Sequence, residues 1–292
     1  MQFIDGKACA GLLLESLEVV VSDFQSTYKR SPRLNIIRIS DDFASKVYTK
    51  TKMRVAKAIG IEVEITILPE MVKESEAIEA IKSLNNDDAV DGIILQLPLP
   101  EHLSKDVLLD EISPNKDVDG ISKYNMGCLV RARPNFIPCT PQGLLRLAKY
   151  IDLDIKGLNV IILGQSIIVG RPAALVFLNM GATVTVCHSA TKDLEAKIKT
   201  ADILISAMGA TGIVNPKWIK SGAVVFDVGI NRNTSNEIQG DIDQQACNHV
   251  GFVTPVPGGV GPMTVACLQF NTVLAAINRV DDKHLLEKMA LI

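Results

Sequence analysis

The chain has few of the residue types that metal sites, disulfide-rich folds and membrane segments require. Its 292 residues include 4 histidines and 6 cysteines, and aromatic residues make up 4%. The cysteines form no C-x-x-C pair, so we expect six reduced thiols, with neither a zinc site nor a disulfide framework. No stretch reaches the roughly 18 apolar residues of a membrane span. The first residues lack a basic region followed by a long apolar run, so no signal peptide is expected and the predicted location is the cytoplasm.

An excess of positive charge is also missing. The net charge is −3 and the isoelectric point is near 5.9, which disfavours binding to nucleic acid. Hydrophobic residues make up 47% and charged residues 22% of the sequence, an ordinary profile for a soluble α/β protein. A chain of this length is expected to form about two domains, each with its own core.

Apolar periodicity in the first half of the chain alternates between helix and strand. Helical spacing covers residues 8–28, 45–59, 74–84 and 101–111, and strand patterns cover 34–39, 61–68 and 92–97. This alternation predicts a small parallel sheet covered by helices. Residues 113–133 are richer in polar and turn residues. Three prolines then mark the predicted crossing into a second domain: Pro134, Pro138 and Pro141.

The second half contains a strand, a glycine turn, a helix and a second strand in succession. Residues 160–164 read as an apolar strand, Gly164-Gln165-Ser166 as the turn, and Gly170 opens a helix that leads to a strand at 182–187. The helix N-terminus of such a βαβ unit can bind a phosphate on its free N–H groups. The spacing G-x-S-x-x-x-G differs from the G-x-G-x-x-G fingerprint, so this stretch alone fits a simple tight turn equally well.

Further alternation completes a second sheet. Strand patterns cover 202–206, 223–228 and 251–254, and helical patterns cover 192–199 and 262–279. The predicted fold class is therefore α/β, with two α/β domains facing each other across a cleft.

Tyr48 and Lys52 lie four residues apart on the helix predicted at 45–59, so they share one face. The neighbouring stripe, positions 47, 51, 55 and 59, is predicted to face the core. Other basic residues lie nearby, so a solvated helix face is one interpretation. In the other, Tyr48 stacks on an aromatic substrate and a partly desolvated Lys52 handles a proton, because burial can bring a lysine pKa toward neutrality.

Two polar motifs follow strands of the first sheet. Gln96 lies near the end of the strand in DGIILQLPLP, at the edge where open α/β folds bind ligands, although it also fits an ordinary edge residue. In KDVDG, Asp117 and Asp119 fit an Asx-turn loop, a two-point contact to a guanidine-like N–H edge, or magnesium. No further acidic residues cluster with them to favour the metal.

The stretch TPVPGGVGPMT at 254–264 alternates glycine and proline. It fits either a flexible linker or a fixed loop whose backbone contacts a ligand. The prolines favour the fixed loop because they restrict the backbone freedom that the glycines provide.

Taken together, these stretches resemble the bifunctional methylenetetrahydrofolate dehydrogenase/cyclohydrolase family. The resemblance covers nearly the whole chain and keeps the family's order. The matching motifs are Tyr48-x-x-x-Lys52, DGIILQLPLP, KDVDG, PCTPQG, GQSIIVGRP, DVGIN, GDID and PVPGGVGPMT.

The resemblance implies a folate-binding catalytic domain at 1–138, completed by a C-terminal helix at 264–292, and a Rossmann-type NADP-binding domain at 139–263. It also implies a cytosolic homodimer in one-carbon metabolism, linked to purine, methionine and histidine biosynthesis, with tetrahydrofolate derivatives as substrates.

The resemblance also implies roles for particular residues. Tyr48 would stack on the folate, Lys52 would be the catalytic lysine, Gln96 would support it and Asp119 would hold the pterin edge. The folate-side loop would be the backbone of Pro257, Gly258 and Gly259. The implied NADP contacts are Gly164, Gln165, Ser166, Ser189 and Ile230.

Two stretches depart from the family's pattern. The family commonly has an arginine where this chain has Gln165, and that arginine serves the 2′-phosphate of NADP. The second strand ends in Cys187-His188-Ser189 without the acidic residue that binds the ribose of NAD, so we expect a modest preference for NADP. In the loop at 39–45, relatives usually have a glycine and a proline that this chain lacks, which bears on substrate affinity.

Three other functions stay open at this point. One is a dehydrogenase with little cyclohydrolase activity, which the presence of Lys52 argues against. Another is a shikimate-type or amino-acid dehydrogenase, which leaves KDVDG and PVPGGVGPMT unexplained. The third is a folate-binding protein without turnover, which would be favoured by a broken site, and none of the predicted site residues is missing.

Overall fold

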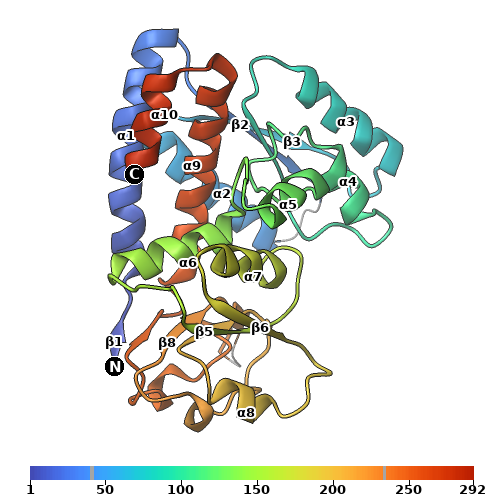
Figure 1. Cartoon of the computed structure of the whole chain (residues 1–292). Coiled ribbons are helices and arrows are strands. Elements are labelled where there is room, and N and C mark those ends of the chain that lie inside the picture. The colour runs from blue at the N-terminus through green and yellow to red at the C-terminus, as the bar shows by residue number, and fades with distance from the viewer. Residues whose placement is uncertain (40–42, 233–234) are drawn as a thin grey trace. The chain divides into compact units, whose positions relative to one another are not determined.

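A computed structural model describes residues 1–39, 43–232 and 235–292 (Figure 1). Residues 40–42 of the divergent loop at 39–45 therefore lie outside the described residues. The chain divides into two compact units. One contains Met1–Gly11 and Thr140–Thr264, and the other contains Leu12–Cys139 and Val265–Ile292.

The second of these units contains a three-stranded parallel sheet in the order β3-β2-β4. Its central strand is buried along nearly its whole length, as expected where helices cover both faces of a parallel sheet. A parallel bridge between Ile93 and Asp117 extends the sheet beyond β4. The elements of this unit up to residue 139 are α1 (Gly6–Tyr28), β2 (Arg33–Arg38), α2 (Phe43–Ala58), β3 (Glu62–Ile67), α3 (Glu74–Asn86), β4 (Gly92–Leu95), α4 (Lys105–Glu111) and α5 (Lys123–Val130).

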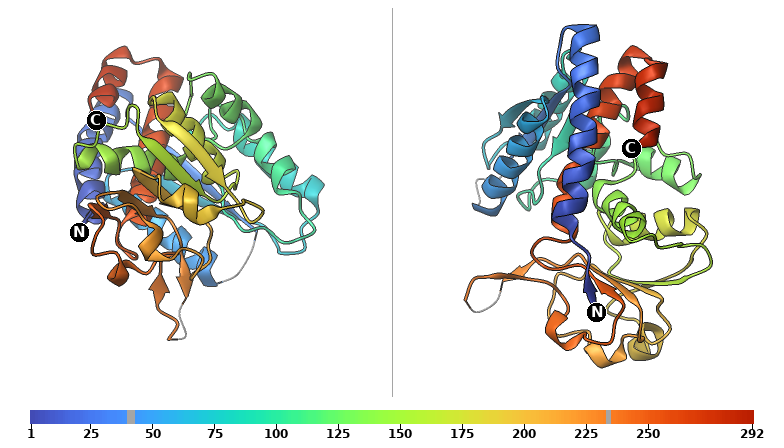
Figure 2. Two further views of the ribbon diagram at one scale, coloured as in Figure 1. Left: turned by 60° about the horizontal axis from the view of Figure 1, so that its bottom comes forward. Right: turned by 90° about the vertical axis from the view of Figure 1, so that its left-hand side faces the viewer.

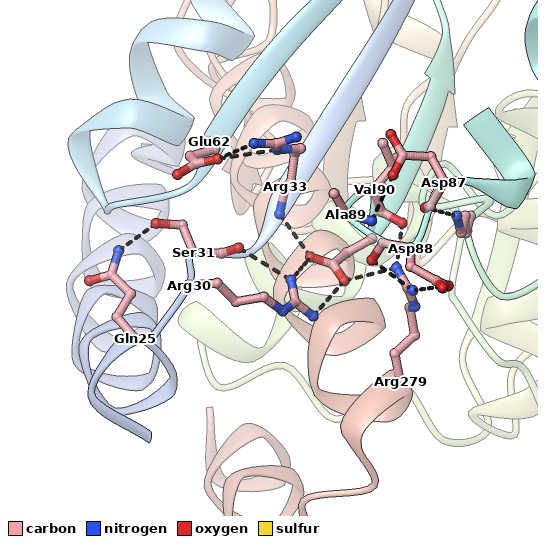
Figure 3. Close-up of polar contacts among 12 residues, drawn as sticks. Gln25, Arg30, Ser31, Arg33, Glu62, Asp87, Asp88, Ala89, Val90 and Arg279 are labelled. Carbon is pink, nitrogen blue, oxygen red and sulfur yellow. Dashed lines mark hydrogen bonds and ion pairs between the residues drawn. The ribbon is translucent and has the colours of Figure 1, made fainter. Parts of the chain in front are cut away.

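A buried carboxylate ties the N-terminal ends of β2 and β4 to the last turn of α9 (Val260–Val280) (Figure 3). Asp91 is fully buried and accepts two hydrogen bonds from the Arg30 guanidinium, at 2.6 and 3.0 Å, and one from the backbone N–H of Arg33. Arg279 donates to the same carboxylate at 3.2 Å and to the Val90 carbonyl. Because these contacts lie at the amino end of β4, Asp91 stabilises the fold at the opposite end of the strand from Gln96.

The C-terminal part of the chain forms two helices, α9 and α10 (Lys283–Leu291), where the sequence predicted one. Both run beside α1 (Figures 1 and 2), and Tyr28 donates a 2.8 Å hydrogen bond to Asp282 at the start of α10. Among the described helices, α9 is by length and composition alone long and apolar enough to cross a membrane. However, 72% of its most apolar window is buried inside the fold, which is typical of the core helix of a soluble protein.

The other unit contains a six-stranded parallel sheet in the order β1-β11-β8-β7-β5-β6. The strands are β1 (Gln2–Phe3), β5 (Asn159–Leu163), β6 (Thr183–Cys187), β7 (Ile203–Ser206), β8 (Val224–Asp227) and β11 (Phe252–Val253). The helices are α6 (Cys139–Tyr150), α7 (Gly170–Asn179) and α8 (Leu194–Ile198), and β9 (Asn231–Arg232) pairs with β10 (Ile238–Gln239) in a separate hairpin. The parallel α/β sheets predicted from sequence are confirmed.

The order of this sheet marks where a ligand is expected. From β5 the chain first adds β6 on one side and then β7 and β8 on the other, so the strand order reverses at the carboxyl end of β5. Open α/β sheets bind ligands at such a point.

β1 pairs with β11, and the first eleven residues cluster with the six-stranded sheet. The chain passes from one unit to the other between Cys139 and Thr140.

Candidate active site

The inward face of α2 is mostly polar. One helix stripe, with the spacing i, i+4, i+7 and i+11, contains Ser45, Thr49, Lys52 and Ala56. Three of these residues, Ser45, Thr49 and Ala56, are each 0–1% exposed. The predicted core-facing stripe is wrong at its N-terminal end, because Val47 is 44% exposed. Only its last member, Ile59, is buried. Apolar periodicity misplaces the face here because the part of α2 that turns inward is polar.

Lys52 and Gln96 lie in direct contact. The Lys52 Nζ donates a 2.9 Å hydrogen bond to Gln96 Oε1, and the Gln96 amide in turn donates from Nε2 to the Leu97 carbonyl at 2.7 Å. Gln96 is the first residue after β4 and is buried, so the strand end fixes its position. The second hydrogen bond orients the amide so that its oxygen faces the lysine.

Burial lowers the pKa of the Lys52 amino group below its usual value, and the nearby Asp119 carboxylate opposes that shift. For Asp119 the signs reverse, because burial raises the pKa of its carboxyl and Lys52 opposes the rise. The site therefore holds an amine and a carboxyl. Burial disfavours the charged form of each group, whereas the charge on each group stabilises the opposite charge on the other. Such an amine can accept and release a proton nearer to neutral pH than an exposed lysine can.

The two aspartates of KDVDG have different positions. Asp117 is buried and accepts hydrogen bonds from the N–H groups of Gly120 and Ser122, at 3.1 and 2.9 Å, and from the Asn125 amide at 2.8 Å. These contacts make Asp117 the anchor of an Asx-type loop. Asp119, two residues further on, is only half-buried and lies beside Lys52. Of the two, Asp119 is therefore placed for a ligand.

Two residues at this site carried no signal that marked them in the sequence as neighbours of Lys52. Cys139 is buried, donates from Sγ to the Val118 carbonyl at 3.4 Å, and interacts with both Asp119 and Lys52. Burial and the adjacent Asp119 raise the pKa of the Cys139 thiol well above its usual value, so the thiol stays protonated and is a poor nucleophile. Asn271 of α9 donates to the carbonyls of Val118 and Ile137, at 2.8 and 2.9 Å, and so holds the chain on both sides of the site.

Tyr48 lies one helical turn before Lys52, and 40% of its surface is exposed. An aromatic ring in that position can offer a face to a planar ligand.

In the unit with the six-stranded sheet, the glycine turn follows β5 directly. Gly164 has a φ of +111°, and a side chain there would overlap the carbonyl oxygen of Ala207. A side chain on Gly170 would overlap the carbonyl of Gly164, so both glycines are required by close approach of the backbone. The Ser166 hydroxyl accepts from the N–H groups of Val169 and Gly170 at 3.1 and 3.4 Å, which closes the turn onto the start of α7.

The ends of β5 and β6 lie side by side at this turn. Gly164 donates its N–H to the Cys187 carbonyl at 2.8 Å, and Gln165, Ser166 and Ser189 are all exposed beyond this point. Arg171, in the first turn of α7, donates from Nε to the Gln165 carbonyl at 3.0 Å. A guanidinium group therefore lies against the turn that contains Gln165.

The remaining predicted contacts lie on two loops of the same unit. Ile230 follows β8 and is 53% exposed. In the glycine–proline loop, Gly258 has a φ of +113°, and Gly259 donates its N–H to the Pro255 carbonyl at 2.7 Å. A side chain on Gly259 would clash with Pro255, so the loop forms a fixed turn. Among the described residues, no group of three or more His, Cys, Asp or Glu side chains could hold a metal ion.

Comparison with known proteins supplies the family. Residues 4–119 match the model of the tetrahydrofolate dehydrogenase/cyclohydrolase catalytic domain, and residues 138–280 match that of the NAD(P)-binding domain of the same family. The bifunctional protein FolD of Magnetococcus marinus is 44% identical over 274 residues, which are 94% of this chain and 96% of that protein.

Two solved structures are similar over nearly their whole length. The bifunctional FolD dehydrogenase/cyclohydrolase of Campylobacter jejuni has a TM-score of 0.93 and 42% identity, with 96% of this chain and 99% of that chain covered. The FolD enzyme of Trypanosoma brucei, solved with NADP and an inhibitor, has a TM-score of 0.91 and 35% identity, with 95% and 98% covered. The chain therefore belongs to the tetrahydrofolate dehydrogenase/cyclohydrolase family.

Proposed function

We propose that this protein oxidises 5,10-methylenetetrahydrofolate to 5,10-methenyltetrahydrofolate with NADP, and then hydrolyses the methenyl compound to 10-formyltetrahydrofolate. The observation that carries the proposal is the Lys52–Gln96 hydrogen bond, with Asp119 beside it, in a chain whose two family matches are a catalytic and an NAD(P)-binding domain. The other interpretations, a dehydrogenase with little hydrolase activity and a folate-binding protein without turnover, are not favoured, because this polar site is complete.

Substrate binding is assigned to groups that the geometry leaves available. Tyr48 presents a partly exposed ring for stacking on the folate, and the Asp119 carboxylate accepts from the N–H edge of the pterin. Asp117 cannot share that task because three hydrogen bonds from its own loop occupy it. The fixed backbone of Pro257, Gly258 and Gly259 is proposed to contact the folate as well.

The dehydrogenase step needs no general base. The carbon between the two folate nitrogens loses a hydride, and both nitrogens stabilise the resulting cation. No proton moves, which agrees with a site built on a lysine and an amide. The protein must hold the reacting carbon in near contact with the hydride acceptor and exclude water.

Protons move in the hydrolysis step. Water adds to the methenyl carbon, and neutral Lys52 takes the proton that this water loses. The C–N5 bond then breaks, and Lys52 passes the proton to N5. The hydroxyl on the former methenyl carbon releases its own proton to solvent and becomes the carbonyl of the formyl group, which stays on N10. Gln96 holds the Lys52 amine at 2.9 Å and so fixes the direction of proton transfer.

The residues at the end of β5 fit NADP. Gly164 and Gly170 leave a side-chain-free turn at the start of α7, where the backbone can approach a pyrophosphate. Gln165, Ser166, Ser189 and Ile230 would hold the rest of the dinucleotide, and bound NADP supplies the hydride acceptor. We further propose a cytoplasmic homodimer that supplies one-carbon units for purine, methionine and histidine biosynthesis.

Two separate assays test the proposed function. In the first, the purified protein receives methylenetetrahydrofolate with NADP or NAD, and the reduced cofactor is measured; we expect activity with both and a modest preference for NADP. In the second, it receives methenyltetrahydrofolate without any cofactor, and 10-formyltetrahydrofolate is identified by chromatography. Oxidation without hydrolysis would favour the dehydrogenase with little cyclohydrolase activity, and folate binding without either reaction would favour the binding protein.

A further inference from the structure

Two motifs of the second half, DVGIN and GDID, contain aspartates to which the proposed reaction gives no role. Asp227 and Asp241 are each 1% exposed and lie against each other at the carboxyl ends of β7 and β8. Buried carboxylates of this kind need several hydrogen bonds to remain charged. Their partners show what they do.

Asp241 accepts hydrogen bonds mainly from the loop that follows β7. Its carboxylate accepts from the N–H groups of Met208, Gly209 and Ala210, at 2.8, 3.3 and 3.0 Å. The hydroxyl of Ser206, at the end of β7, donates to it as well, at 3.0 Å. Three successive N–H groups that converge on one anion form a nest of the type that binds phosphates in many proteins. Here the nest is filled by the protein's own carboxylate.

Asp227 holds Asp241 in that position. Asp227 accepts from the N–H groups of Asp241 and Ile242, both at 3.0 Å, and from that of Gly229, also at 3.0 Å. Each aspartate also requires the other motif's glycine, because a side chain on Gly240 would overlap the Asp227 carboxylate and one on Gly229 would overlap that of Asp241. This packing explains why the aspartate and glycine of DVGIN occur together with the glycine and aspartate of GDID. Burial raises the pKa of Asp227 to about 6.

The loop that Asp241 holds is in contact with the glycine turn. Ala207 donates its N–H to the Leu163 carbonyl at the end of β5, at 2.8 Å. Its own carbonyl lies so close to Gly164 that no side chain fits between them. Asn231, which follows Ile230 in the loop after β8, donates to Asp241 at 2.8 Å. Asp241 therefore contacts the loop after β7, which touches the turn assigned to the dinucleotide, and also the loop after β8.

From these contacts we infer that Asp241, oriented by Asp227, is a positioning residue for the dinucleotide. It fixes the loop after β7 against the Gly164 turn and joins it to the loop after β8. It also fills the nest of N–H groups at 208–210, so that the dinucleotide phosphates are directed to the start of α7. The inference rests on the proposed binding of NADP at this turn.

The variant Asp241→Asn tests the inference with little change in shape. One carboxylate oxygen accepts from three donors and the other from two, so whichever oxygen becomes an NH2 group faces N–H or O–H donors. The matched control is Asp243→Asn in the same GDID motif. Asp243 is exposed and caps only the short 3-10 helix at Gln244–Ala246.

Three measurements are made on each protein: the Kd for NADP by isothermal titration, the KM for NADP against kcat, and the hydrolysis of methenyltetrahydrofolate without cofactor. We expect Asp241→Asn to raise Kd and KM for NADP at least tenfold and to leave the cofactor-free hydrolysis within twofold of wild type, and Asp243→Asn to change none of them. If Asp241→Asn does not fold, Ser206→Ala removes one donor and is expected to raise Kd severalfold.

Unchanged NADP affinity in the folded variant, with only a lower melting temperature, would overturn the inference and leave a structural role. So would an equal loss of NADP binding and of cofactor-free hydrolysis, and so would unchanged NADP affinity in Ser206→Ala when Asp241→Asn does not fold. A wild-type protein that does not bind NADP would instead overturn the proposed function, which this experiment therefore distinguishes.

Discussion

Replacing Lys52 by methionine separates the two proposed reactions. The variant keeps an unbranched side chain of similar length on the inward stripe of α2 but removes the amine that donates to Gln96 at 2.9 Å. Hydrolysis requires a group that takes a proton from water, and dehydrogenation does not. We therefore expect Lys52→Met to lose hydrolysis and to retain hydride transfer.

The size of the loss follows from the role of Lys52. A positioned general acid–base contributes about 10²- to 10⁴-fold to a rate. This corresponds to roughly 2.7–5.4 kcal/mol of activation free energy, at about 1.36 kcal/mol for each factor of ten. Because the pKa of Lys52 is lowered by burial, the wild-type enzyme already keeps more of this amine in its neutral form than an exposed lysine would provide, so the variant removes a working base.

The assay follows methenyltetrahydrofolate supplied directly and, separately, NADPH formation from methylenetetrahydrofolate. We expect the hydrolysis rate to fall by at least about a hundredfold, which is the lower end of the range for a positioned acid–base, and NADPH formation to stay within about tenfold of wild type. Lys50→Met, an exposed position on the same helix, is the control and should leave both rates unchanged. Hydrolysis at the wild-type rate in Lys52→Met would refute the assignment, and so would an equal loss of both reactions in a folded variant.

Three further predictions concern other residues. Asp119→Asn removes the anion that raises the pKa of Lys52. The limb of the hydrolysis rate–pH profile that reports loss of the Lys52 proton should therefore move to lower pH, and the KM for folate should rise. A profile that stays in place would contradict the coupling between Asp119 and Lys52. Asp91→Ala leaves Arg30 and Arg279 without their buried partner, so it should lower the free energy of unfolding by about 3 kcal/mol and Tm by roughly 6–12 °C. The control Asp88→Ala removes a fully exposed partner of Arg279 and should have little effect. Gln165→Arg should increase the ratio of kcat/KM for NADP to that for NAD. Arg171→Gln should decrease this ratio, because Arg171 contacts the Gln165 carbonyl. Equal losses with both cofactors in Arg171→Gln would show that its guanidinium does not contribute to the preference for NADP.

The sequence predicted those parts of the fold that have strong local patterns. The apolar runs of β4, β5, β7 and β8 are continuous and short, as expected of strands buried on both faces. Elements without such a pattern were missed. β1 has two residues and pairs with a strand about 250 positions away, so no local pattern marks it. α5 contains the weak helix formers Asn125 and Gly127, and a hydrogen bond from Asn125 to Asp117 ties it to its neighbours.

The prolines near residue 138 were interpreted as punctuation between domains, and the two units divide between Cys139 and Thr140. Pro141 itself lies in the first turn of α6, where a missing N–H has no partner to lose. At the candidate active site, Tyr48, Lys52, Gln96 and Asp119 could be proposed because each lies on a helix face, at a strand end or in a loop with a recognisable pattern. Cys139 and Asn271 could not, because they reach the Val118 carbonyl from distant parts of the chain. The same holds for Asp241, whose role depends on N–H groups more than thirty residues away.

The most direct test of the central claim follows both reactions at once in the wild-type protein. Methylenetetrahydrofolate and NADP are supplied, and NADPH and the methenyl compound are recorded together by absorbance. We predict that NADPH forms while little methenyltetrahydrofolate accumulates, because the site that produces it also hydrolyses it. Accumulation of one methenyl molecule for each NADPH would contradict the account, since it would leave a dehydrogenase in which Lys52 does not act on water.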